Sequence, residues 1–268
     1  MIGFEWILAF LVLGLVVGFM AGLLGIGGGG IMVPVLTTIF LAQGVPVEQV
    51  VHLALGTSMA SIVVTSFASM RAHKKRDGIL WDVFKMMAIG VVLGTFAATF
   101  LATYMKSVHL ALFFSAFMAY VSIQMAIDKK PKPTRVVSGP KGLFFAGSII
   151  GSISALVSIG GGSLTVPYLV WQNVDLKKAI GTSAAIGLPL SIAGTLGYII
   201  NGLMQSSSSA DMMLGFVYLP GVLLISIASF FTAPLGAKVA HKLPVAKLKK
   251  VFALLLIALS IKMLTSIL

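Results

Sequence analysis

The sequence contains no cysteine and little charge. Asp, Glu, Lys and Arg make up 10% of the 268 residues, whereas a soluble domain carries about 25% of them. The absence of cysteine excludes disulfides, thiol catalysis and cysteine-ligated metals. The shortage of charge excludes a soluble monomer, because too few charged side chains are present to cover a surface of this size.

Long apolar runs take the place of charge. Apolar residues are 58% of the chain, and the mean hydropathy is +1.07. Most runs are long enough to cross a ~30 Å hydrocarbon layer as helices, and the alternation that marks a membrane β-barrel is absent. We therefore predict an all-α integral membrane protein of about ten helical segments. They cover residues 6–25, 31–43, 49–70, 83–105, 108–127, 142–158, 163–173, 178–204, 213–237 and 248–268.

Two of these segments, 31–43 and 163–173, are short, and each follows a glycine run. At 1.5 Å per residue they rise only about 20 Å and about 16 Å, so we expect short, broken helices. Pro34 and Pro167 are expected in their first turns, where a missing N–H costs little. Ser163 suits the N-cap position.

Basic residues mark the topology. Sixteen of the 19 Lys and Arg fall in four clusters, at residues 71–76, 129–141, 177–178 and 238–250. We expect all four on the cytoplasmic side of a bacterial inner membrane, because cytoplasmic loops carry the excess of Lys and Arg. This requires each short segment to form a hairpin with the helix before it, and it puts both termini in the periplasm. We therefore attribute the net charge of +12 to the topology of a protein in a lipid bilayer. We expect no nucleic-acid partner.

The chain also repeats itself. Ile26–Pro34 matches Ile159–Pro167 at an offset of 133, and Gly56–Ala60 matches Gly181–Ala185 at 125. A third match pairs Ser122–Met125 with Ser260–Met263. We predict two repeats of five segments, 1–128 and 142–268, joined by a cytoplasmic basic linker, 129–141. Five is odd, so the halves are inverted, which is typical of secondary transporters with a site at the midplane.

The glycine runs are the first candidate site. A helix that restarts within the membrane has N–H groups without intrahelical partners, and the positive end of its dipole attracts anions. The alternative is that small residues only permit a turn and close packing, as Gly14, Gly18 and Gly22 do in our interpretation. Occurrence in both repeats favours a substrate site. Its members are Gly27, Gly28, Gly29, Gly30, Gly160, Gly161, Gly162 and Ser163.

The two Gly-Thr-Ser motifs complete the candidate anion site. They contribute Thr57 and Ser58 in the first repeat, and Thr182 and Ser183 in the second. Hydroxyls continue along both segments at helical spacing, at Ser61, Thr65, Ser191 and Thr195. Alternatively, such hydroxyls bond the carbonyls of their own helix.

Two cationic residues occupy equivalent positions one turn before these motifs. His52 and Lys177 are a possible gate or entrance for an anion, or else plain interfacial residues. The remaining ionisable groups exclude other chemistry. All seven carboxylates fall in loops or at helix ends, so we predict no metal site, no cofactor and no enzyme activity. The glycine runs lack the features of nucleotide-binding loops.

The paired Ile-Gly-Gly-Gly runs, the Val-Pro after each and the two Gly-Thr-Ser motifs resemble the TauE/SafE sulfite-exporter family, over nearly the whole chain. The resemblance implies a bacterial inner-membrane permease for a small sulfur-containing or organic anion, such as sulfite or a sulfonate. No binding residue is carried over from the family. The main hypothesis is therefore an anion secondary transporter with alternating access. A passive anion channel and a non-transporting membrane scaffold are the alternatives.

Overall fold

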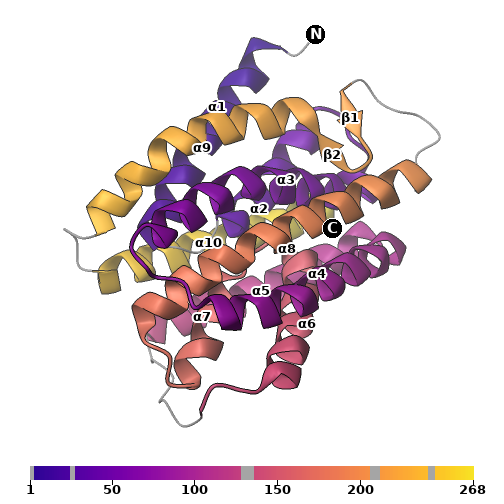
Figure 1. Cartoon of the computed structure of the whole chain (residues 1–268). Helices are drawn as coiled ribbons and strands as arrows, with labels where there is room; N and C mark the ends of the chain where they lie inside the picture. The colour runs from indigo at the N-terminus through magenta and orange to yellow at the C-terminus, as the bar shows by residue number, and fades with distance from the viewer. Residues whose placement is uncertain (1–2, 25–27, 128–135, 206–211, 241–244) are drawn as a thin grey trace.

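The structure is a computed structural model that describes residues 3–24, 28–127, 136–205 and 212–240, together with 245–268. Within these residues the chain forms ten α-helices and one two-stranded hairpin (Figure 1). This confirms the predicted all-α membrane architecture. The helices are α1 Phe4–Leu24, α2 Gly29–Ala42, α3 Val47–Lys74, α4 Trp81–Tyr104, α5 Ser107–Ile127, α6 Pro140–Val157, α7 Gly162–Trp171, α8 Leu176–Gln205, α9 Leu219–Ala240 and α10 Val245–Ile267.

Eight of the helices in the described part are long and apolar enough to cross a membrane. The two others are α2, with 14 residues, and α7, with 10. Both begin where the sequence predicted a broken helix. The predicted place of the prolines is wrong, however, because α2 and α7 start earlier than expected. Pro34 and Pro167 are each the sixth helical residue, so each removes the N–H that would bond the carbonyl four residues earlier.

Each short helix folds back on the helix before it. Gly28 lies beside Val17, and the rings of Phe10 and Phe40 are 6.3 Å apart, so α2 runs antiparallel to α1. In the second half, Gln172 follows α7 and Ser138 precedes α6. The Ser138 N–H donates to Gln172 Oε1 at 3.1 Å, and Gln172 Nε2 donates to the Ser138 hydroxyl at 2.7 Å. Both predicted hairpins are present.

The hairpins define two ends of the bundle. We call the end where α1 begins the α1 end; it also holds the start of α3 and the end of α8. We call the opposite end the basic end, because Arg71, Lys74, Lys75 and Arg76 lie at the end of α3 there. The start of α8 is at the same end, where Lys178 pairs with Asp77 at 3.7 Å. Most described basic residues thus share one end, as the sequence predicted.

Small residues allow the outer helices to pack closely. The backbones of α1 and α9 meet at Gly14, Gly18 and Gly22. A Cβ added to Gly14 would lie 2.7 Å from the Ile225 carbonyl oxygen, and one added to Gly18 would lie 2.3 Å from Thr232 Oγ1. The pair α4 and α6 meets in the same way. The predicted packing role of the three α1 glycines is confirmed.

One segment predicted to be helical is not. Residues Met213–Leu214 and Val217–Tyr218 form strands β1 and β2, which pair antiparallel around Gly215. Gly215 has a φ of 57°, in the left-handed region that glycine enters without strain. Helix α9 therefore begins at Leu219 rather than near residue 213. The hairpin lies at the α1 end beside α3, and Phe216 of its turn stacks on His52 with ring centroids 5.2 Å apart.

Candidate functional site

The two glycine breaks meet in the middle of the bundle. Gly29, the first residue of α2, lies against the end of α6, where a Cβ added to it would fall 1.6 Å from the Ser158 carbonyl oxygen. Helices α3 and α8 flank the contact. Ile62 of α3 lies beside Gly29, and a Cβ added to Gly187 of α8 would be 3.0 Å from the Gly160 carbonyl oxygen. Two segments 133 residues apart in the sequence thus form one site.

Both short helices begin with backbone N–H groups that no side chain caps. Gly28 and Gly161 occupy the N-cap positions in the left-handed conformation, at φ 74° and 78°, and neither forms a side-chain cap hydrogen bond. The prediction that Ser163 is an N-cap is wrong, because the left-handed cap position favours glycine and the helix starts two residues earlier than a Ser163 cap requires. The positive end of one helix dipole therefore begins at Gly28, and that of another begins at Gly161.

Three hydroxyls close to the breaks have no partner. Ser163 and Thr165 lie in the first turns of α7, and Ser154 lies in the last turn of α6; each hydroxyl oxygen is buried without a hydrogen bond. Thr165 Oγ1 would lie 3.6 Å from a Cβ added to Gly161. An unpartnered hydroxyl in an apolar interior is unfavourable, so such groups mark places where a ligand or water completes the bonding.

Sequence reasoning missed Thr165 and Ser154. Thr165 was inside the repeated motif, but its equivalent in the first repeat is Met32, so the repeat gave no signal for it. Ser154 lies five residues before the motif and shows no repeat match. Only the fold brings both next to the break. Gly27 lies outside the described residues, and the other predicted members of the glycine runs are in or beside the central contact.

The Gly-Thr pairs have a different use in the fold. The Thr57 hydroxyl accepts the Tyr218 N–H at 3.0 Å, just before α9, and the Thr182 hydroxyl accepts the Leu80 N–H at 2.9 Å, just before α4. Gly56 lies against the Phe216 carbonyl, and Gly181 lies against the Gly78 carbonyl. Each repeat thus holds the start of the fourth helix of the other repeat. Ser58 and Ser183, the next residues, are buried and have no partner.

These two motifs lie on opposite sides of the crossing of α3 and α8. Gly187 of α8 lies beside Ser66 of α3, and Gly56 lies beside Tyr198, so α3 and α8 run antiparallel. Thr57 is therefore displaced toward the α1 end and Thr182 toward the basic end. Five residues of helix, about 7.5 Å, separate Thr57 from Ile62 and Thr182 from Gly187. The first motif is also close to the α6 end, because the Ser158 hydroxyl donates to the Leu55 carbonyl at 3.4 Å. The structure joins the two glycine runs and keeps the two Gly-Thr-Ser motifs apart.

The hydroxyls further along α3 and α8 bond their own helices. Ser61 donates to the Thr57 carbonyl at 2.9 Å, and Thr65 donates to the Ile62 carbonyl at 3.0 Å. On α8, Ser191 and Thr195 also donate to carbonyls of their own helix. The alternative interpretation of these hydroxyl stripes is therefore correct.

The two candidate gate residues are at opposite ends. His52 is 4% exposed, and its Nε2 lies 3.0 Å from the Ala102 carbonyl oxygen, so it links α3 to the end of α4. Lys177 is exposed at the start of α8, where Asp175 Oδ1 accepts its N–H at 2.9 Å. The structure does not bring the two side chains together. A gating role for either residue stays a prediction.

Comparison with known proteins agrees with this architecture. The family model described as "Sulfite exporter TauE/SafE" matches residues 10–263. A probable membrane transporter protein of Haemophilus influenzae is 37% identical over 97% of this chain and 98% of its own length. One from Methanocaldococcus jannaschii is 29% identical over 90% of each chain. No solved structure matches significantly. The chain spans a membrane many times and is a membrane transporter protein of the TauE/SafE sulfite-exporter family.

Proposed function

We propose that the chain is a secondary transporter for a small sulfur-containing or organic anion, such as sulfite or a sulfonate, in the bacterial inner membrane. The observation that carries the proposal is the contact between the two glycine breaks. It brings the start of α2 to the turn between α6 and α7, and the unpartnered Ser163 and Thr165 hydroxyls lie in the first turns of α7. N–H groups, helix dipoles and hydroxyls together favour an oxyanion.

The absence of nearby acids supports an anion rather than a cation. Each carboxylate in the described part is exposed, and none lies on the central turns of a membrane helix. These are Glu5, Glu48, Asp77, Asp82 and Asp175. The positive ends of α2 and α7 therefore meet no negative side chain from this set. A cation at the breaks would face two repulsive dipoles, whereas an anion gains from both.

Reciprocal contacts between the halves support an inverted repeat and alternating access. Thr57 of the first repeat holds the segment before α9, and Thr182 of the second holds the segment before α4. The close helix pairs α1 with α9 and α4 with α6 are related by the same exchange. Two halves related in this way can exchange conformations around a central site, which is how many transporters work. The basic end is cytoplasmic in this proposal, by the excess of Lys and Arg there.

The experiment is counterflow of sulfite in proteoliposomes. Wild-type protein should show saturable uptake that internal sulfite accelerates, because a carrier returns faster when loaded. Thr165→Val removes a free hydroxyl without changing the side-chain shape and should weaken binding by about 0.5–3 kcal/mol. Thr65→Val is the control, because its hydroxyl bonds its own helix.

Two results would contradict the proposal. Flux that rises linearly with concentration and shows no counterflow would indicate the passive anion channel. Equal loss of transport in Thr165→Val and Thr65→Val would show that the free hydroxyl at the break has no special part in binding. If sulfite fails, a panel of sulfonates and carboxylates at equal charge tests the broader class of small anions.

A further inference from the structure

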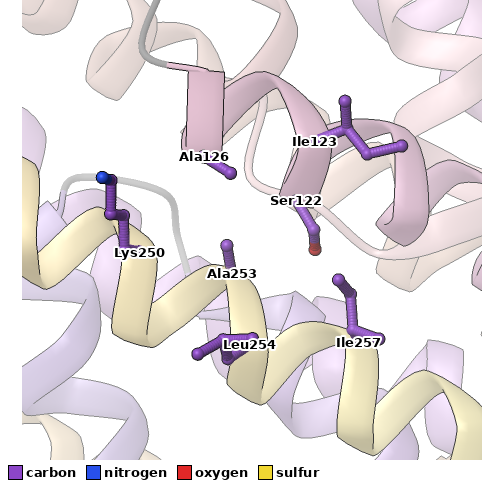
Figure 2. Close-up of a pocket in the computed structure, with 7 residues that line it drawn as sticks. All are labelled: Ser122, Ile123, Ala126, Lys250, Ala253, Leu254 and Ile257. Carbon is purple, nitrogen blue, oxygen red and sulfur yellow. The ribbon is translucent and has the colours of Figure 1, made fainter.

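A groove runs between α5 and α10 on the outside of the bundle, and Met118 and Leu256 of the same two helices pack against Gly30 of α2. Its first part has a volume of about 280 Å³, and Figure 2 shows the residues that line it. The floor is buried: Ser122 is 0% exposed and Ala253 is 3% exposed. The walls are open and apolar, because Ile123 is 56% exposed and Leu254 is 69% exposed. In a membrane these walls face lipid.

One end of the groove carries a positive charge. Lys250 lines it at the basic end, and Ala253, Leu254 and Ile257 follow along α10 (Figure 2). The Lys250 residue is exposed. A lysine at the membrane surface attracts anionic headgroups, by about 1 kcal/mol for each Lys or Arg. The groove therefore joins a cationic surface position to an apolar channel.

The floor of the groove carries an unsatisfied polar group. Figure 2 shows the Ser122 hydroxyl directed into the space between the two helices, toward Ile257. This oxygen is buried and has no hydrogen-bond partner. Ser61 and Ser148 donate to carbonyls of their own helices, whereas Ser122 is among the described serines whose hydroxyl has no partner. The small Ser122 and Ala253 side chains leave room for the groove between the two helices.

The groove continues toward the α1 end. A second cavity of about 340 Å³ shares Ile257 with the first and reaches Ser260, Ile261 and Leu264. The distance along α10 from Lys250 to Ile261 is about 16 Å at 1.5 Å per residue, close to half of a ~30 Å hydrocarbon layer. The shape therefore suits a single extended chain that starts at one surface and ends near the middle of the bilayer.

We propose that this groove binds one anionic phospholipid. Its phosphate lies on the Lys250 ammonium, and one acyl chain follows the apolar walls past Ile257. The charge at the rim favours an anionic over a zwitterionic headgroup. This site is separate from the central breaks and does not depend on the proposed transport function.

The test is native mass spectrometry of the full chain in detergent, with phosphatidylglycerol or phosphatidylcholine of the same acyl chains. Wild-type protein should retain one phosphatidylglycerol about fivefold more strongly than phosphatidylcholine, the ratio that about 1 kcal/mol gives. Lys250→Gln should reduce this preference to near one. Ala126→Leu, which fills the open rim of the groove, should lower retention of both lipids.

Lys75→Gln is the matched control, because Lys75 is exposed at the same end but does not line the groove. It should keep the wild-type preference. The proposal is overturned if Lys75→Gln and Lys250→Gln lose the preference equally, since the attraction would then be diffuse. It is also overturned if Ala126→Leu retains lipid normally, or if the protein is a dimer that Ala126→Leu dissociates, since a second copy would then occupy the groove.

Discussion

Helices α2 and α7 have matching sequences and unequal surroundings. Ten of the 14 residues of α2 are buried, whereas in the 10-residue α7 the buried ones are Gly162, Thr165 and Leu169. Helix α2 packs against α1, α3 and α10, and α7 packs mainly against α8. Equivalent segments of the two halves are therefore covered to different extents.

The more buried and the less buried short helix extend toward opposite ends of the bundle. Helix α2 extends from the central breaks toward the α1 end, and α7 extends from them toward the basic end. The half of the structure on the α1-end side of the breaks therefore holds the more buried short helix. In the proposed transport cycle, the two short helices would exchange these environments.

The largest effect is expected from Gly29→Ala, at the point where the two breaks touch. The added Cβ would fall 1.6 Å from the Ser158 carbonyl oxygen, so the α2 start and the α6 end must separate. We expect a loss of about 3 kcal/mol or more in stability, measured as a lower melting temperature in detergent. Gly139→Ala is the control, because Gly139, like Gly29, has no positive φ but has nothing within 4 Å of the added atom. A wild-type melting temperature for Gly29→Ala would contradict the close contact of the breaks.

The second prediction concerns cysteine labelling, which either occurs or does not. It determines on which side of the membrane the basic end, toward which α7 extends, lies. The chain has no cysteine, so single cysteines report their position without background. Lys106→Cys, exposed at the α1 end, should react with an impermeant maleimide added to intact cells, and Lys75→Cys should react only after lysis. Labelling in the reverse order would place the basic end in the periplasm.

A graded effect should separate the two short helices directly. Leu164→Cys on α7 is half-buried and Val33→Cys on α2 is fully buried. With a small permeant thiol reagent, Leu164→Cys should react several times faster, because less packing must open to expose it. Added substrate should slow this reaction. Equal rates at both positions would contradict the unequal burial of the two short helices.

The smallest effect is expected at the two threonines that link the halves. Thr57→Val and Thr182→Val each leave one backbone N–H without its acceptor, which costs about 1–3 kcal/mol. We expect similar decreases in melting temperature for the two variants, because the bonds of 3.0 Å and 2.9 Å are equivalent. A decrease in only one variant would show that the halves depend on these contacts unequally.

The fold was predictable because its signals are local. Length and hydrophobicity predict the long helices, glycine runs predict the broken ones, and the basic clusters require the two hairpins. The start of α9 was not predictable in the same way. Residues 213–218 are apolar and read as helix, but the positive φ at Gly215 and the docking of Phe216 beside His52 turn them into a hairpin. Those contacts come from tertiary structure.

The site was predictable only in part, for a related reason. The glycine runs were found because they repeat, and the structure brings them together. The use of Thr57 and Thr182 depends on N–H groups of Tyr218 and Leu80, more than 100 residues away along the chain. Thr165 has no hydroxyl equivalent in the first repeat, so comparison of the halves could not find it. A repeat or a periodic pattern in the sequence cannot reveal a partner that is distant along the chain. It also cannot reveal a residue that has no equivalent in the other repeat.

The reciprocal threonine contacts also bear on how the protein is made. When the first half has entered the membrane, Gly56 and Thr57 have no partner, because Phe216 and Tyr218 are not yet synthesised. Leu80 likewise waits for Thr182. The first five helices therefore complete their packing only after the ninth begins to insert. Neither half is a self-sufficient folding unit, and a chain cut in the 129–141 linker should assemble only when both pieces are synthesised in the same cell.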